Sequence, residues 1–368
     1  MKSESAATVA QNPRAQTLSA QLSLQSLSRY TEIIDARTPA EFAEDHVPGA
    51  INLPVLDNEE RIRIGTLHKQ ISAFEAKKVG AALVSRHIAD YLESHFADKS
   101  PGYRPLVYCW RGGNRSGSFT HVLQRVGFKA EQLDGGYKAY RRLVINELET
   151  LPTQFRFVVI CGPTGSGKSR LLQALQALGA QVLDLETLAA HRGSLLGNLP
   201  GQPQPSQKKM ESLIWWALRH FDPSKPVYVE SESKKIGNLH VPDVLLAHMR
   251  AAPGVWLQAS LPLRVQLLLE DYAHFPIQPA ELLEKISHLT ELRGHATIDR
   301  WQSLIHSQDW PGFVQDMLEN HYDPAYQKSL GRNYQGADKD DARQALNLTG
   351  IQSDHFTELA RQILGASA

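Results

Sequence analysis

Cysteines and long apolar runs are scarce in this chain of 368 residues. It has two cysteines, Cys109 and Cys161, which excludes a disulfide framework and favours a reducing compartment. No stretch approaches the roughly 20 apolar residues that span a membrane. Residues 1–28 are rich in Ser, Ala and Gln and contain no apolar run typical of a signal peptide. We therefore expect a cytoplasmic protein with no membrane partner, whose head, residues 1–19, is disordered.

The chain also lacks an excess of charge of either sign. Lys and Arg together number 39, as do Asp and Glu, so the formal net charge is zero. This balance argues against a general attraction to nucleic acid but leaves room for a local basic face. Apolar residues make up 42% and charged residues 21%, which excludes wholesale disorder. Because the length exceeds what one core usually holds, two domains are expected.

Short apolar runs alternate with helical patterns in both halves of the chain. This alternation is typical of parallel sheets flanked by helices, so the predicted fold class is α/β. We expect one domain over residues 20–150 and a second over residues 151–335, with a helical part at its end. Residues 336–368 are expected to form a polar linker and a short last helix. Strands are predicted at residues 32–35, 50–53, 105–109, 155–161, 181–185, 226–230 and 254–259.

A cysteine loop connects a predicted strand to a helix at residues 108–117, YCWRGGNRSG. Two glycines allow successive backbone N–H groups to point inward, and the helix start adds positive potential. Such a cradle favours the thiolate of Cys109 and can hold an anion, which Arg115 could clamp with a bidentate fork. The alternative is a buried structural cysteine at the end of a strand.

A phosphate loop follows the strand expected at residues 155–161. Residues 162–169, GPTGSGKS, match the pattern G-x-x-x-x-G-K-S between a strand and a helix. Backbone N–H groups would wrap a diphosphate, Lys168 would reach its outer oxygens, and the Ser169 hydroxyl could hold Mg²⁺. Cys161 is interpreted as a packed strand residue. The residues expected to bind the phosphates are Gly162, Thr164, Gly165, Ser166, Gly167, Lys168 and Ser169.

The acidic residues of a nucleotide hydrolase are less clear. The strand at residues 226–230 ends in Glu230-Ser-Glu232 where a Walker B aspartate is usual. Asp184 and Glu186 follow another strand and could serve a metal or simply be solvated acids. No metal-ligand set is therefore predicted, and the loop indicates a diphosphate more firmly than ATP hydrolysis.

A helix expected over residues 207–221 carries tryptophans among basic residues. Aromatic rings can stack on splayed bases while cations contact phosphates, which is typical of RNA binding. The alternative is that both tryptophans are wedged between packed layers. The residues predicted to contact tRNA are Lys208, Lys209, Trp215, Arg219, Lys234 and Lys235.

The first half of the chain resembles the rhodanese family. The resemblance rests on the cysteine loop and on three further stretches, residues 34–42, 46–52 and 133–137. It implies a cysteine that carries sulfur or selenium, with Cys109, Arg111 and Arg115 as catalytic residues and Asp35 and Arg37 as supports. Five residues separate Cys109 from Arg115, where many rhodaneses have four. That spacing is similar to the loop of dual-specificity phosphatases on the same fold.

The whole chain, a rhodanese-like domain followed by a P-loop NTPase-like domain, resembles the tRNA 2-selenouridine synthase family. The matching stretches of the second half are residues 182–186, 191–194, 229–237 and 319–324. The resemblance implies that geranyl diphosphate alkylates the wobble 2-thiouridine of tRNAs for Lys, Glu and Gln, and that selenium from selenophosphate then replaces the geranylthio group. It also implies an enzyme that produces selenophosphate as a partner.

Two other classes stay open at this point. One is a thiol phosphatase or sulfurtransferase on the rhodanese fold, coupled to a nucleotide-binding P-loop domain. The other is a binding module in which the phosphate loop senses a nucleotide and the cysteine is structural.

Overall fold

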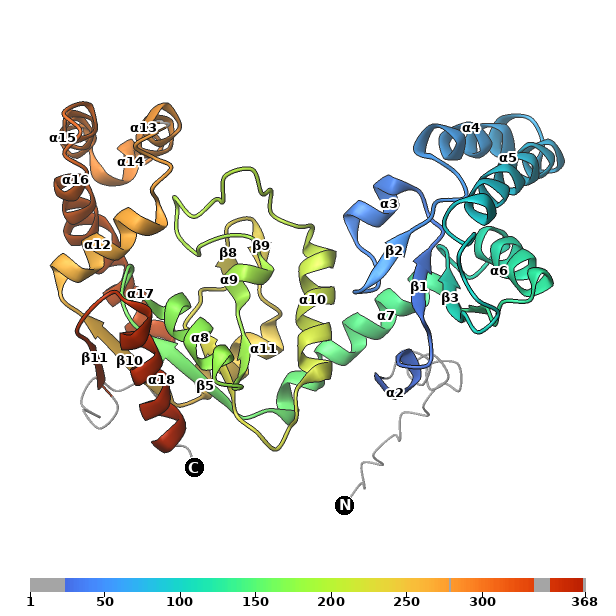
Figure 1. Ribbon diagram of the computed structural model, residues 1–368. Helices are drawn as coiled ribbons and strands as arrows, with labels where there is room; N and C mark the ends of the chain where they lie inside the picture. The colour runs from blue at the N-terminus through green and yellow to red at the C-terminus, as the bar shows by residue number, and fades with distance from the viewer. Residues whose placement is uncertain (1–23, 278, 334–344, 367–368) are drawn as a thin grey trace, which may run out of the picture. The chain divides into compact units, whose positions relative to one another are not determined.

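The computed structural model describes residues 24–277, 279–333 and 345–366, and the chain forms two compact units (Figure 1). Unit 1 extends to Glu147 and includes Glu211–His220, whereas unit 2 contains the remaining residues. The predicted head and most of the predicted polar linker lie outside the described residues. No helix in the described part of the chain is long and apolar enough to cross a membrane.

Unit 1 is built on a parallel sheet of four strands in the order β2-β1-β3-β4. Its core contains Ile34, Val107, Phe119 and Leu123, all fully buried. The strands are β1 (Glu32–Asp35), β2 (Ala50–Asn52), β3 (Pro105–Tyr108) and β4 (Glu131–Gln132). The helices are α2 (Leu24–Leu27), α3 (Pro39–Glu44), α4 (Asn58–Gln70), α5 (Ala73–Glu93), α6 (Asn114–Val126) and α7 (Gly136–Leu148).

Unit 2 contains a second parallel sheet, with five strands in the order β11-β10-β5-β7-β6. The strands are β5 (Phe157–Cys161), β6 (Gln181–Leu183), β7 (Val227–Glu230), β10 (Gly254–Ala259) and β11 (Ala345–Leu348), beside a hairpin of β8 (Lys235–Ile236) and β9 (Leu239–His240). The helices around the sheet are α8 (Lys168–Ala177), α9 (Leu185–Leu188), α11 (Asp243–Ala251) and α12 (Leu261–Asp271), with the 3₁₀ turn Leu151–Gln154 before β5. Helix α10 (Gln207–His220) begins in unit 2 and belongs to unit 1 from Glu211 onward. The predicted α/β class and the seven predicted strands are confirmed, with ends that differ by up to two residues.

A helical part follows α12 and has an apolar core of its own. Leu282, Ile286, Trp301 and Phe313 are buried in it. It consists of α13 (Pro279–Ser287), α14 (Thr290–Arg293), α15 (His295–His306), α16 (Trp310–Met317), the π-helix Leu318–Tyr322 and α17 (Asp323–Asn333). These helices lie in the range where a helical part of the second domain was expected.

The end of the chain returns to the sheet of unit 2, which the sequence did not predict. β11 pairs in parallel with β10, and Phe356 of α18 (Ser353–Ala366) is buried in the same core as Ile160 and Leu172. The predicted last helix is therefore present, but it is part of the unit 2 core rather than an appendage.

Helix α10 is an integral element of unit 1 from Glu211 onward. Trp215 is fully buried, its ring lies edge-on to Tyr140 of α7 at 5.6 Å, and its indole N–H donates to Glu147 at 2.8 Å. Ser212 donates to the buried Asp45 at 3.0 Å. These contacts correct the expectation that Trp215 stacks on RNA bases, because the ring is enclosed by protein.

The complete burial of Trp215 predicts that its side chain contributes strongly to stability. Trp215→Ala should lower the free energy of unfolding by about 3–5 kcal/mol, because it leaves a large cavity and removes the hydrogen bond from the indole to Glu147. Unfolding by heat or urea, followed by circular dichroism, measures the loss. Trp216→Ala, at a half-buried neighbouring position, is the control and should cost much less; equal losses in both variants would contradict this packing.

Candidate functional site

The cysteine loop leaves β3 and enters α6, and it is held by backbone contacts with the start of α7. The N–H of Tyr137 donates to the Cys109 carbonyl at 2.8 Å, and the N–H of Lys138 donates to the Trp110 carbonyl at 2.9 Å. Gly136 has φ +58°, and a Cβ there would collide with the Cys109 carbonyl and the Gly112 nitrogen. Only glycine allows this approach without displacing the loop.

Cys109 itself is nearly enclosed, with 3% of its surface exposed. Ser116, on the first turn of α6, places its Oγ 3.1 Å from the Cys109 Sγ. Trp110 and Arg111 follow at the exposed rim, where the indole lies 5.4 Å from the Tyr137 ring. The cysteine loop therefore presents one sulfur at the carboxyl end of a buried strand, beside an exposed aromatic ring.

The guanidinium of Arg115 is already engaged by a carboxylate. Its Nη1 and Nη2 lie 2.7 and 3.2 Å from the two oxygens of Glu41. Burial alone would raise the pKa of Glu41, but hydrogen bonds from Arg115 and from the Thr38 backbone lower it on balance. The Arg115 guanidinium, which was predicted to bind an anion, is therefore paired with the Glu41 carboxylate. An anionic ligand would have to displace Glu41 from it.

Asp35 and Arg37 support the cysteine loop through Tyr137. They form a fully buried ion pair at 2.7 Å at the carboxyl end of β1, whose last residue is Asp35. The Arg37 guanidinium lies 3.9 Å from the ring centre of Tyr137, whose backbone N–H holds the cysteine loop. Burial alone would lower the pKa of Arg37, and its hydrogen bonds with Asp35 raise it on balance.

The phosphate loop connects β5 to α8 in unit 2, as predicted. Gly165 and Gly167 have φ of +77° and +89°, in the region that favours glycine. Lys168 Nζ donates to the Gly162 carbonyl at 2.8 Å, and the Gly162 N–H donates to the Tyr326 hydroxyl at 2.9 Å. The Lys168 side chain therefore lies over the phosphate loop, where it is expected to bind the phosphates.

Residues far along the chain hold this loop in place. Arg264 of α12 donates from Nε to the Thr164 carbonyl at 2.9 Å. The same guanidinium is clamped by both oxygens of Asp323, at 2.9 and 2.6 Å. Asp323 belongs to the stretch 319–324, one of the stretches that resemble the tRNA 2-selenouridine synthase family. In the structure it holds Arg264 against the phosphate loop.

Carboxylates line the phosphate loop on the side of β6 and β7. Ser169 donates to Glu186 at 2.8 Å, and the N–H of Glu186 donates to Glu230 at 2.9 Å. A Cβ on Gly193 would lie 2.7 and 2.8 Å from oxygens of Glu186 and Glu232, so these two side chains converge on the 191–194 loop. Burial, with further repulsion from Glu186, raises the pKa of Glu232 to about 8.

No group of three or more His, Cys, Asp or Glu side chains within the described ranges is arranged to hold a metal ion. The structure does bring oxygen donors together at Ser169 and Glu186, beside the phosphate loop.

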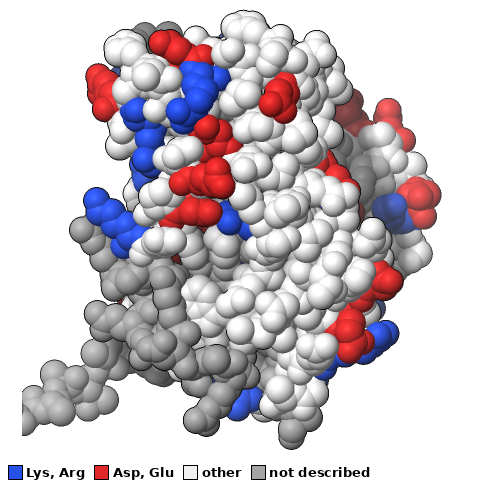
Figure 2. All heavy atoms as spheres, turned by 90° about the vertical axis from the view of Figure 1, so that its left-hand side faces the viewer, with Lys and Arg blue, Asp and Glu red and all other residues white. Residues whose placement is uncertain are grey.

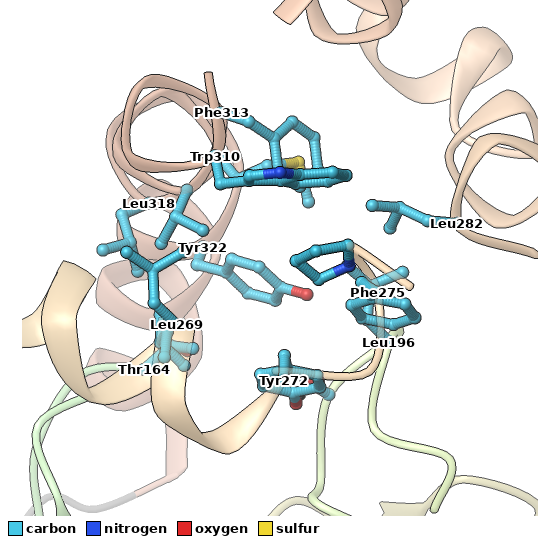
Figure 3. A pocket seen from close by; sticks show the side chains of 15 residues that line it. Thr164, Leu196, Leu269, Tyr272, Phe275, Leu282, Trp310, Phe313, Leu318 and Tyr322 are labelled. Atoms are coloured by element: carbon cyan, nitrogen blue, oxygen red, sulfur yellow. Dashed lines mark hydrogen bonds between the residues drawn. The ribbon is translucent and has the colours of Figure 1, made fainter. Parts of the chain in front are cut away.

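A small apolar cavity of about 50 Å³ adjoins the phosphate loop (Figure 3). Thr164 of the loop lines both this cavity and the larger polar cleft that contains Lys168. Sequence patterns did not reveal the cavity, because its walls come from separate elements. Its apolar walls include Leu196, Leu269, Phe275, Leu282, Trp310, Phe313 and Leu318.

The basic residues predicted to contact tRNA have varied surroundings. Arg219 lies 3.5 Å from Glu147 and above the Trp215 ring, so it is tied to the packing of α10. Lys208 and Lys209 are half-buried, whereas Lys234, paired with Asp243 at 2.8 Å, and Lys235 are exposed near the β8–β9 hairpin. Gln207 joins α10 to this hairpin through two hydrogen bonds with His240.

Figure 2 shows a face of the molecule on which Lys and Arg side chains lie among Asp and Glu side chains. The described residues on that face do not gather into one extended basic patch.

Two family models match the parts of the chain that contain these loops. Residues 15–143 match the family model of the rhodanese-like domain, and residues 155–286 match the model of the tRNA 2-selenouridine synthase AAA domain. The predicted order of a rhodanese-like and a P-loop-containing domain is thereby confirmed.

Curated relatives match both halves together. The chain is 37% identical over 246 residues to the tRNA 2-selenouridine synthase of Nitrosomonas europaea, a match that covers 66% of this chain and 63% of that relative. It is 39% identical over 254 residues to the enzyme of the same name from Alcanivorax borkumensis, with 67% and 68% covered. With the Sulfurovum sp. relative of that name it shares 30% identity over 334 residues, covering 82% and 90%. The match thus spans less than two thirds of the first relative and nine tenths of the third.

The raised pKa of Glu232 beside the phosphate loop predicts how pyrophosphate binding depends on pH. Because Glu232 is neutral below about pH 8 and charged above it, binding of inorganic pyrophosphate should weaken as the pH rises from 7 to 9. The extra charge should cost about tenfold or more in affinity. Glu232→Gln should lose this part of the pH dependence, as measured by calorimetry.

Glu358→Gln, an exposed acid on α18, is the matched control and should keep the wild-type profile. Identical profiles for wild type and Glu232→Gln would show that this carboxyl does not face the ligand.

Proposed function

The chain belongs to the tRNA 2-selenouridine synthase family, and from this membership we propose that it converts wobble 2-thiouridine in tRNA to 2-selenouridine. The observation that carries the proposal is the presence, in one chain, of a cysteine loop and a phosphate loop that both have their supporting contacts in place. The tRNAs we propose as substrates are those for Lys, Glu and Gln, as the family resemblance implies.

The first step we propose is alkylation of the base at the phosphate loop. The thiocarbonyl sulfur attacks C1 of geranyl diphosphate, the C1–O bond breaks, and diphosphate leaves with the electron pair while N3 of the base loses its proton. Backbone N–H groups and Lys168 would stabilise the departing diphosphate. The apolar cavity that begins at Thr164 supports this assignment, because it offers a geranyl chain an apolar wall next to the diphosphate site.

Mg²⁺ would suit the same site. The Ser169 hydroxyl and the Glu186 carboxylate supply oxygen ligands of the kind this ion prefers, and diphosphate oxygens would complete its shell. The ion would neutralise charge on the leaving group.

The second step we propose belongs to Cys109. The selenium of selenophosphate attacks C2 of the alkylated base, and the geranylthio group leaves with the electron pair of the C2–S bond and takes up a proton. Water then hydrolyses the Se–P bond, which releases phosphate and leaves 2-selenouridine with a proton on N3. Selenophosphate, delivered by the enzyme that produces it, would supply the selenium that Cys109 handles. The thiol-phosphatase alternative has less support, because only the five-residue spacing between Cys109 and Arg115 favours it.

Replacing the cysteine should separate the two steps. In Cys109→Ser, selenium transfer should be lost while alkylation continues, because diphosphate departure depends on the other domain. S-geranyl-2-thiouridine should then accumulate, as measured by mass spectrometry of digested tRNA. Cys161→Ser, which changes the other, fully buried cysteine, should form 2-selenouridine. Loss of alkylation in a folded Cys109→Ser protein would contradict the assignment.

Replacing the loop lysine should block the earlier step. Lys168→Ala should slow alkylation by about two orders of magnitude, as does the loss of one preorganised transition-state donor. The reaction of the purified wild-type protein should need no ATP. Lys78→Ala, at an exposed lysine of unit 1, is the control. A strict ATP requirement would instead indicate a kinase-like mechanism.

A further inference from the structure

A chain of hydrogen bonds reaches the Cys109 sulfur from a residue outside the cysteine loop. Gln132, in strand β4, donates from Nε2 to the Ser116 Oγ at 2.9 Å. The Ser116 Oγ lies in turn 3.1 Å from the Cys109 Sγ. Ser116 is fully buried, so water does not compete for its hydroxyl group.

The partners of Gln132 fix the direction of this chain. Its side-chain nitrogen also lies 2.7 Å from the Gly112 carbonyl oxygen. A carbonyl oxygen only accepts, so the NH₂ end of the amide must face the loop, with one hydrogen for Gly112 and one for Ser116.

The Ser116 hydroxyl then has its own hydrogen left to donate. Its oxygen already accepts from Gln132, and its neighbours are the Cys109 Sγ at 3.1 Å and the Gly113 carbonyl at 3.5 Å. The longer distance is at the limit of a hydrogen bond, whereas 3.1 Å is short for a sulfur acceptor. The hydrogen therefore points to the sulfur.

We propose that Ser116 is a further catalytic residue, whose hydroxyl stabilises the Cys109 thiolate, and that Gln132 is the positioning residue that aims that hydroxyl. A hydrogen bond to the charged form of a group favours that form, and bonds to ions are the stronger ones. Arg115 does not replace this donor in the described structure, because Glu41 holds its fork. The proposal rests on the proposed function only in giving the thiolate its role in selenium transfer.

Alkylation of Cys109 by iodoacetamide tests the proposal without tRNA, selenium or geranyl diphosphate. The full-length protein is treated over a range of pH, and mass spectrometry of the Cys109 peptide gives the rate at each pH. Cys161 does not interfere, because burial raises the pKa of its thiol to about 11. The measured quantity is the pH at which the alkylation rate reaches half its maximum.

Three variants and one control separate the roles. Ser116→Ala should raise the midpoint by about one pH unit, the effect of losing one hydrogen bond to a charged group. Gln132→Leu should raise the midpoint by a smaller amount. The Ser116 hydroxyl can still donate its hydrogen to the sulfur, but Gln132 no longer fixes its orientation. Gln132→Glu should raise the midpoint most, since a carboxylate of the same shape accepts the hydroxyl hydrogen and adds negative charge. Gln124→Leu, at a glutamine that donates to the Ala130 carbonyl, should leave the midpoint unchanged.

The double variant tests whether Gln132 acts through Ser116. In a Ser116→Ala background, Gln132→Leu should add no further shift, because the group it aims is gone. Additive shifts would overturn the positioning role, and wild-type midpoints in both Ser116→Ala and Gln132→Leu would overturn the proposal as a whole. If the midpoints shift as expected but the wild-type protein makes no 2-selenouridine, the proposed function fails and the thiolate assignment stands.

Discussion

Both candidate sites depend on one constraint, the close approach of a second backbone segment to a loop that follows a buried parallel strand. At Gly136 the start of α7 touches the cysteine loop so closely that a Cβ would collide with it. At Gly162 a Cβ would lie 2.7 Å from the Leu257 carbonyl of the neighbouring strand. Because the carboxyl ends of parallel strands meet at one edge of a sheet, these loops open where ligands of α/β proteins usually bind.

The sequence predicts the parts of this arrangement that are local. Each loop is a contiguous run between a strand and a helix, so spacing alone identifies Cys109 and Lys168. The residues that support the loops, Gln132, Arg264 and Tyr326, come from distant elements and leave no local pattern. The interpretation of α10 was wrong for Trp215, because aromatic residues among basic ones are also typical of a helix packed by its flank. Its partner α7 lies about seventy residues away, and no periodicity predicts that contact.

The two units offer different chemical groups to a ligand, a sulfur atom in unit 1 and phosphate-binding groups in unit 2. The cysteine loop offers a sulfur, an O–H donor and a guanidinium held by Glu41, which suit the handling of a chalcogen. The phosphate loop offers backbone N–H groups, a lysine and an adjoining apolar cavity, which suit an amphiphilic diphosphate. In the proposed reaction, prenylation would turn the thiocarbonyl sulfur into a leaving group, so the product of the first step would be the substrate of the second.

The nucleosides of cellular tRNA test this account most directly. Total tRNA from cells that carry the gene and from cells that lack it, both grown with a selenium source, is digested and quantified by mass spectrometry. The account predicts that 2-selenouridine and S-geranyl-2-thiouridine disappear together without the gene, that 2-thiouridine remains, and that the intact gene restores both. Unchanged 2-selenouridine in cells without the gene would contradict it.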